Sequence, residues 1–213
     1  KKSEKGEEAN DPAFAKALTE LGDVYVCDAF ASAHRAHASM VGIALPSYAG
    51  LNLMEEVSAL ASTLETPKRP VAAIIGGAKV STKLALIENL IAKMDMIILG
   101  GGMANTFFLA QGHDVGKSLC EADMVDQAKS ILAKAKEQNC EIILPIDGLM
   151  AKEFKADTSY SNSPIVKIRE DEMMLDIGID SITLFKEKLK KAKTVLWNGP
   201  LGAFEIVPFD QGT

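Results

Sequence analysis

Short apolar runs alternate with amphipathic stretches along most of the 213-residue chain. The runs are rich in Val, Ile and Leu and are not interrupted by polar residues, which is typical of parallel strands covered on both faces. The stretches between them repeat apolar residues at helical spacing. The pattern predicts strands at 24–27, 71–75, 96–99, 141–144 and 194–197, and another at 165–168 after an irregular stretch.

Helices are expected between these strands, and two of them carry start signals. Asn10 and Asp11 precede Pro12, and Asn52 is followed by Glu55 in the spacing of a capping box. Helices are predicted at 12–21, 52–64, 81–93, 104–111, 123–138 and 181–191. Strands separated by helices make a three-layer α/β/α fold with parallel, Rossmann-like sheets.

A proline-bounded connector, Pro67-Lys68-Arg69-Pro70, is the predicted domain boundary. It divides the chain into parts of two domains, at 1–51 and 67–213, joined by a helix and hinge at 52–66. The first residue is Lys rather than Met, and the chain stops in mid-pattern after Phe209. We therefore expect an internal piece of a longer protein, with both ends missing.

Composition narrows the class of protein. Apolar residues make up 47% and charged residues 24%, and the net charge of −6 argues against nucleic acid as the main partner. No apolar run has the length needed to span a bilayer. The three cysteines are odd in number and lack the spacing of a metal site, which fits a reducing cytosol. The composition therefore predicts a cytoplasmic protein that binds neither membrane nor nucleic acid.

Glycine and small polar residues collect where the predicted strands end, at Gly76–Gly77, Gly100–Gly102, Asp147 and Asn198–Pro200. In open α/β sheets, ligands bind outside the carboxyl ends of the strands. The most suggestive of these segments is Gly76 to Lys83. Its glycines permit close approach of a ligand, and Lys79 and Lys83 at the predicted helix start form a possible clamp for an anion. The alternative is two solvated lysines. The segment lacks the spacing of a P-loop.

The segment Gly100 to Asn105 partly matches the dinucleotide fingerprint, but Asn105 stands where that motif has glycine or alanine. Its glycines suit either a planar base or a tight turn. A nicotinamide-dependent oxidoreductase would rest on such glycine turns alone, and it predicts that NADH binds more strongly than ADP.

Two further segments carry candidate chemistry. His34, Arg35 and His37 lie within four positions, and Arg35 can bind a carboxylate or phosphate through two hydrogen bonds. A metal site is less favoured because no third ligand stands at a familiar spacing, and a solvated basic loop is the alternative. Near the other end, Glu205 follows the strand end at Asn198. Its carboxylate suits ribose hydroxyls, or it simply caps a helix.

Taken together, six segments resemble phosphoglycerate kinase, in that family's order and over nearly the whole chain. They are Gly22–Phe30, Ala33–Gly42, Gly76–Val80, Gly100–Ala104, Val115–Ser118 and Trp197–Glu205. The resemblance implies a glycolytic enzyme that moves a phosphoryl group reversibly from 1,3-bisphosphoglycerate to ADP, giving 3-phosphoglycerate and ATP. It also implies a monomer that uses Mg²⁺ bridging the nucleotide phosphates.

The same resemblance assigns roles to regions and residues. Residues 1–51 correspond to part of the triose-phosphate domain, and residues 67–213 to a nucleotide domain truncated at its end. Arg35 and His37 match the triose site, and Lys83, Lys79 and Arg35 are the implied catalytic residues. The implied nucleotide-binding residues are Gly77, Ala78, Lys79, Lys83, Gly101, Gly102, Asn198, Pro200 and Glu205.

Some features depart from the family's pattern. Met174 stands where many members have a glycine beside the adenine. The family's late glycine-rich loop, which holds the transferring phosphate and supplies the magnesium ligand, would follow Thr213. The sequence therefore predicts no metal ligand within this chain. It also leaves open a second possibility, namely a nucleotide-binding fragment that turns nothing over.

Overall fold

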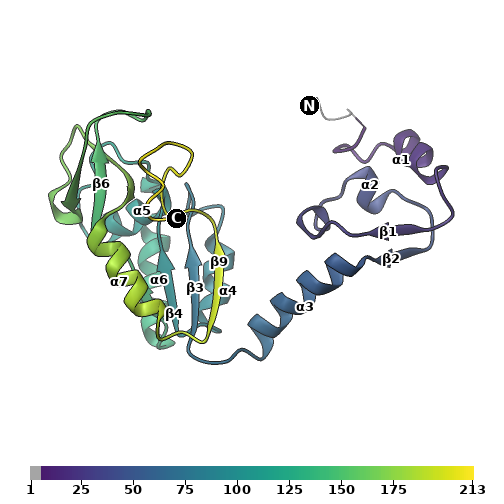
Figure 1. The fold of residues 1–213 in the computed structure, drawn as a ribbon, viewed down its shortest axis with the longest axis horizontal. Coiled ribbons are helices and arrows are strands. Elements are labelled where there is room, and N and C mark those ends of the chain that lie inside the picture. Colours follow the sequence, from purple (N-terminus) through teal and green to yellow (C-terminus); the bar gives the residue numbers. More distant parts are fainter. Residues whose placement is uncertain (1–5) are drawn as a thin grey trace. The chain divides into compact units, whose positions relative to one another are not determined.

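The computed structural model describes residues 6–213, which divide after Thr66 into two compact units (Figure 1). Fully buried apolar side chains are concentrated in the second unit. In the described part of the first unit, only Ala15 and Ala38 belong to that class. Within residues 6–213, no helix combines the length and the apolar character needed to cross a bilayer.

The first unit begins with helix α1 (Pro12–Thr19), which the sequence predicted. The Asp11 carboxylate accepts a hydrogen bond from the Phe14 N–H at 2.8 Å and so caps its first turn. Two short strands, β1 (Tyr25–Cys27) and β2 (Ser47–Ala49), pair in parallel. The 3₁₀ turn η1 (Phe30–Ser32) and helix α2 (Ala38–Val41) connect them.

Helix α3 (Leu51–Glu65) follows β2, and it does not use the predicted capping box at Asn52 and Glu55. The helix begins one residue earlier, with Gly50 at the N-cap position and no capping side chain there. A carboxylate from elsewhere replaces the box: Asp28 accepts from the Leu53 N–H at 2.8 Å and from the Asn52 amide at 2.7 Å. A Cβ on Gly50 would lie 2.3 Å from that carboxylate, so glycine leaves room for the cap.

The second unit is built on a four-stranded parallel sheet in the order β5-β4-β3-β9 (Figure 1). Its strands confirm the predictions to within one residue: β3 (Val71–Ile75), β4 (Met96–Leu99), β5 (Glu141–Ile143) and β9 (Thr194–Asn198). Every residue of β3 and β4 is buried. Central strands of a covered parallel sheet lose both faces to helices, which explains their uninterrupted apolar sequence.

Four helices pack around this sheet and complete the predicted α/β class. They are α4 (Leu84–Ile91), α5 (Gly102–Ala110), α6 (Val125–Glu137), which the 3₁₀ turn η2 (Ala122–Met124) precedes, and α7 (Ile179–Leu189). Helix α6 contacts both α4 and α5. In Figure 1, α7 lies in front of the sheet while α5 and α6 lie behind it. The main core joins residues of β3, β4 and α5 to Ile177 and Phe185.

A second, antiparallel sheet in the order β7-β6-β8 is a feature that the sequence did not predict. Its strands are β6 (Asp147–Ala151), β7 (Tyr160–Pro164) and β8 (Met173–Ile177). The predicted strand at 165–168 was wrong, because Ile165–Lys167 forms the 3₁₀ turn η3. The central strand β6 is fully buried, whereas β7 is polar and mostly exposed, so it carries no apolar run that would reveal a strand.

Candidate functional site

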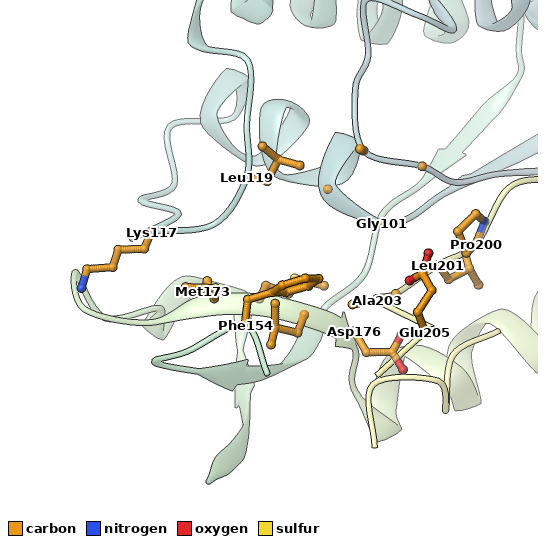
Figure 2. A pocket seen from close by; sticks show the side chains of 16 residues that line it. Gly101, Lys117, Leu119, Phe154, Met173, Asp176, Pro200, Leu201, Ala203 and Glu205 are labelled. Atoms are coloured by element: carbon orange, nitrogen blue, oxygen red, sulfur yellow. The ribbon is translucent and has the colours of Figure 1, made fainter. Parts of the chain in front are cut away.

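A cavity of about 460 Å³ opens in the second unit between the strand-end turns and the antiparallel sheet (Figure 2). Its size lies within the usual range for small-molecule sites. Six segments of the chain line it: Gly77–Ala78, Gly101–Gly102, Lys117 with Leu119, Phe154, 173–176, and 200–205 without Phe204. The cavity therefore lies at the carboxyl ends of the parallel strands, as the fold rule expects.

One wall of the cavity is made by backbone, and we call Gly76, Gly77, Gly101, Gly102 and Pro200 the glycine wall. Gly101 has φ +68°, and a Cβ there would lie 2.7 Å from the carbonyl oxygen of Gly77 and 3.0 Å from that of Pro200. A Cβ on Gly76 would lie 1.9 Å from the Pro200 oxygen. Three turns that are far apart in sequence thus meet through atoms that leave no room for side chains.

Backbone hydrogen bonds hold the glycine wall together. The Gly101 N–H donates to the carbonyl of Leu201 at 2.9 Å, and the Met103 N–H donates to the carbonyl of Gly77 at 3.0 Å. The Gly76 N–H donates to the carbonyl of Asn198 at 2.9 Å. Strands β3, β4 and β9 are thereby joined at their carboxyl ends by main-chain hydrogen bonds.

The remainder of the lining comes from side chains, and we call Lys117, Leu119, Phe154 and Met173 the side-chain wall. Phe154 and Met173 lie across the cavity from Leu119 and Gly101 in Figure 2, with Lys117 at one end. Sequence reasoning missed these four residues. Phe154 and Met173 are placed by the antiparallel sheet, which was not predicted.

Glu205 and Pro200 lie at the end of the cavity opposite Lys117 (Figure 2). Met174, noted in the sequence as a departure from the family's glycine, does line the cavity, but its side chain is 9% exposed and packs in the main core. It packs against Gly148, where a Cβ would lie 2.8 Å from the methionine chain. The extra side chain therefore turns into the core.

Asp176 is a buried carboxyl beneath the cavity, and the sequence analysis did not single it out. It accepts hydrogen bonds from the N–H groups of Ile177 at 2.8 Å and Gly212 at 2.9 Å. Burial raises the pKa of this carboxyl from 3.8 to about 6, although backbone N–H donors act in the opposite direction. A Cβ on Gly202 would lie 2.1 Å from its oxygen, so glycine at that position leaves room for the carboxylate.

Lys83 lies immediately behind the glycine wall. Its Nζ donates to the carbonyl oxygens of Gly76 at 2.7 Å and Asn198 at 3.2 Å, and to the side-chain oxygen of Asn198. Burial lowers the pKa of this ammonium. The bonds place a positive charge across the carboxyl ends of β3 and β9. A Cβ on Gly199 would lie 2.7 Å from Nζ, so glycine is needed there to admit the lysine.

The predicted pair of lysines on the first helical turn was wrong in its geometry. Helix α4 begins at Leu84, not Ser81, and Lys83 occupies its N-cap position. Lys79 lies in the preceding turn, is exposed and does not line the cavity. The cause is a contact from another part of the chain: Glu121 binds the N–H and the hydroxyl of Ser81, which holds residues 79–83 in turns rather than a helix.

The structure brings most of the predicted nucleotide-binding residues to one place. Those that line the cavity are Gly77, Ala78, Gly101, Gly102, Pro200 and Glu205. Asn198 and Lys83 are bonded to each other beside it, and Lys79 lies outside it. Arg35 and His37 belong to the other unit. His37 precedes helix α2 and its Nδ1 lies 3.8 Å from a Glu7 carboxylate oxygen, whereas Arg35 is exposed.

Within residues 6–213, no three His, Cys, Asp or Glu side chains are grouped as a metal site requires. The acidic residues of the cavity are Asp176 and Glu205, and both oxygens of Asp176 already accept backbone hydrogen bonds. Mg²⁺ favours several oxygen ligands in octahedral geometry. The described residues therefore do not form a magnesium site by themselves.

Comparison with known proteins identifies the family. The family model "Phosphoglycerate kinase" matches residues 2–213. Phosphoglycerate kinases from Methylorubrum extorquens (strain PA1) and Rhodospirillum centenum are each 58% identical to the chain, covering 98% of it and 52% and 53% of their own lengths. The chain thus spans about half the length of the curated relatives it matches.

Solved structures agree in fold. The phosphoglycerate kinase of Coxiella burnetii superposes with a TM-score of 0.83 at 44% identity, covering 98% of this chain and 55% of that one. That of Pyrococcus horikoshii gives a TM-score of 0.80 at 31% identity, covering 93% of this chain and 51% of that one. With its cavity at the strand ends and its match over nearly every residue, this chain belongs to the phosphoglycerate kinase family.

Proposed function

We propose that the cavity of the second unit binds ADP or ATP. We further propose that the protein transfers a phosphoryl group between 1,3-bisphosphoglycerate and ADP, giving 3-phosphoglycerate and ATP. The observation that carries the proposal is the direct continuity between the glycine wall, which suits a planar base, and the Lys83 ammonium, which suits phosphate. Lys83 and the two glycine turns meet at Gly76 and Gly77.

The base would lie between the two walls. The glycine wall presents backbone, with Leu119 on the same side, and Phe154 and Met173 present apolar surface from the other side. Aromatic and apolar faces bind a base without requiring a particular hydrogen-bond pattern. Glu205, at the end of the cavity near Pro200, would accept hydrogen bonds from the ribose hydroxyls, as the resemblance implied.

Lys83 would neutralise charge on the nucleotide phosphates. Its ammonium now bonds three protein oxygens around Gly76 and Asn198, so a phosphate must replace at least one of them. Asn198 would thereby act through Lys83. Phosphoryl transfer depends mainly on positioning and charge stabilisation, which a half-buried lysine beside closely packed backbone would supply. Lys79, exposed in the preceding turn, is free to add a second charge at longer range.

The triose would bind in the first unit, at the basic segment that contains Arg35 and His37. Arg35 offers an exposed guanidinium for a carboxylate or phosphate. Helix α3 would be the connector that lets the two units close, bringing the substrates in line and excluding water that would hydrolyse the acyl phosphate. Arg35 would serve, as the resemblance implied, to stabilise charge on the group in transfer.

Magnesium would arrive with the nucleotide and bridge its phosphates. Because the described residues form no metal site, we assign no step of this chain's chemistry to a metal ligand and expect that ligand beyond Thr213. The remaining expectations follow from composition and family resemblance. They are a cytoplasmic, glycolytic enzyme, monomeric, with neither nucleic acid nor a membrane as partner.

Calorimetric titration of the 213-residue chain with ADP and with NADH tests the proposal. ADP should bind, NADH should bind more weakly, and Lys83→Ala should weaken ADP binding by roughly tenfold, since a hydrogen bond to a charged group contributes about 1.5–3 kcal/mol. Preference for NADH would overturn the proposal in favour of an oxidoreductase. A coupled assay for ATP formation on the same chain separates turnover from binding alone.

A further inference from the structure

Behind the cavity, one acidic side chain joins three segments that build its walls. Glu121 lies four residues after Lys117 and two after Leu119, which line the side-chain wall. Its carboxylate reaches across to the turn at 79–83, which leads into Lys83. Its main-chain N–H is bound by α5, the helix that starts from the glycine wall at Gly102. Neither the sequence motifs nor the proposed chemistry assigned it a role.

The carboxylate is held by the turn through two bonds. One oxygen accepts from the Ser81 N–H at 2.9 Å, and the other accepts from the Ser81 hydroxyl at 2.5 Å. Hydrogen bonds from Ser81 and the Val80 N–H, with the nearby charge of Lys79, lower the pKa of Glu121. The side chain therefore stays ionised, and it satisfies N–H groups that a turn ahead of a helix otherwise leaves free.

The backbone around Glu121 is fixed from the other side by two buried residues of α5. The Glu121 N–H donates to the Thr106 hydroxyl at 3.0 Å, and the Asn105 amide donates to the carbonyl of Leu119 at 3.0 Å. Thr106 is 0% exposed and Asn105 is 1% exposed. The Asn105 amide and the Thr106 hydroxyl both belong to buried residues of α5. Their hydrogen bonds therefore hold the segment from Leu119 to Glu121 against that helix.

The turn controls the position of Lys83. The Lys83 N–H donates to the carbonyl of Val80 at 2.8 Å. The main chain of Lys83 is therefore part of the same short turn that Glu121 binds. Without the carboxylate, the N–H of Ser81 loses its partner and the turn loses its link to α5. The ammonium would then sample more positions before reaching phosphate, which weakens binding through lost preorganisation.

We propose that Glu121 is a positioning residue for the nucleotide phosphates: it locks the 79–83 turn to α5 and thereby sets the place of Lys83. The inference rests on the proposed nucleotide site. It predicts that removing the Glu121 charge changes ADP affinity in the opposite direction from the one that electrostatics alone would give. Removing a negative charge near a phosphate site should tighten anion binding if charge alone matters, whereas loss of a positioning contact should weaken it.

The test compares ADP and adenosine binding to the 213-residue chain by NMR titration in five forms: unsubstituted, Glu121→Gln, Ser81→Ala, the double variant of these two, and Asp123→Asn. Asp123 is the matched control, because it is an exposed acid two residues from Glu121 with no bond to the 79–83 turn. Glu121→Gln should weaken ADP by about tenfold, as expected for a charged hydrogen bond, and adenosine by less than about twofold. Ser81→Ala should weaken ADP in the same direction and add little in the double variant.

Each outcome has one meaning. If Glu121→Gln binds ADP as tightly as Asp123→Asn does, or more tightly, the positioning role is wrong while the nucleotide site stands. If ADP and adenosine weaken by the same factor, Glu121 serves only general stability and the inference is again overturned. If the unsubstituted chain binds no ADP, the proposed function fails and this inference fails with it. A loss of ADP affinity in Glu121→Gln that exceeds the loss of adenosine affinity supports the positioning role.

Discussion

The two walls of the cavity are built in opposite ways. The glycine wall is backbone from three turns, and a methyl group added at Gly76 or Gly101 would overlap a carbonyl oxygen of a neighbouring turn. The side-chain wall is made of long or aromatic groups, and Phe154 and Leu119 remain 60% and 55% exposed. The first wall is closely packed against neighbouring backbone, whereas the second is largely exposed.

This difference indicates that the two walls would contribute to ligand binding in different ways. In the proposed site, the backbone surface beside the Lys83 ammonium would fix where the base and phosphates lie, because close-packed backbone does not adjust to a poor fit. The exposed side chains would cover the ligand once it is bound and would contribute mainly contact area. Substitutions in the two walls should therefore differ in kind as well as in size.

The largest effect is expected for Gly101→Ala. The substituted residue keeps a positive φ of 68° and brings a Cβ to 2.7 Å from the Gly77 oxygen, so both strain and overlap act. We expect roughly 3 kcal/mol or more of lost stability from these combined causes, and loss of measurable ADP binding. Chemical unfolding and calorimetry on the 213-residue chain measure the two effects.

Gly112→Ala is the matched control for that substitution. Gly112 also has a positive φ, 86°, but nothing lies within 4 Å of a Cβ there. It should lose only the cost of backbone strain, about 1 kcal/mol, with ADP binding unchanged. Equal effects from the two alanines would show that overlap in the glycine wall does not matter.

A pH-dependent effect is expected next, at Asp176, whose carboxylate links β8 of the antiparallel sheet to the Gly212 N–H. Its pKa is raised from 3.8 to about 6 in the folded chain, so the folded state holds this proton more tightly than the unfolded state does. The protonated carboxyl therefore adds to the free energy of unfolding. This stabilisation is fully present below pH 3.8 and is lost as the pH rises through about 6. The shift corresponds to at most about 3 kcal/mol.

Asp176→Asn removes the titration. The free energy of unfolding of the unsubstituted chain, taken relative to this variant, should fall between pH 4.5 and pH 7.5. Urea unfolding at several pH values measures the difference. A relative stability that stays flat, or that rises with pH, would mean that the buried carboxyl titrates at or below its ordinary value.

The smallest effect is expected in the side-chain wall, for Phe154→Ala. Loss of a stacking face should weaken ADP by about 1–2 kcal/mol, in the range found for aromatic contacts with bases. Stability should change little because the ring is 60% exposed. Val166→Ala, at a side chain that is 68% exposed and outside the cavity, is the control. If Phe154→Ala costs as much as Gly101→Ala, the two walls are not distinct.

The parallel sheet was predictable because its signal is local. Val71 to Ile75 and Met96 to Leu99 are apolar throughout, and glycines follow both. These features report burial on both faces and tight turns without reference to the rest of the chain. For the same reason, three of the glycines that line the cavity, Gly77, Gly101 and Gly102, were named from the sequence, together with Pro200 and Glu205.

The parts that were missed depend on distant residues. Strand β6 opens with buried Asp147, which is held by the N–H and hydroxyl of Ser181, 34 residues later. The start of α4 is moved to Leu84 by Glu121, 40 residues after Ser81. Phe154 is carried to the cavity by a sheet whose outer strand β7 is polar. Hydrogen bonds of this range leave no periodic trace in a single sequence.

The central claim is that the glycine wall and Lys83 form one nucleotide site, and an ADP titration followed by backbone amide chemical shifts tests it most directly. We predict that the amides of Gly77, Lys83, Gly101 and Leu201 shift together on one binding curve. Shifts confined to the basic segment around Arg35 and His37, with the strand-end glycines unmoved, would contradict it.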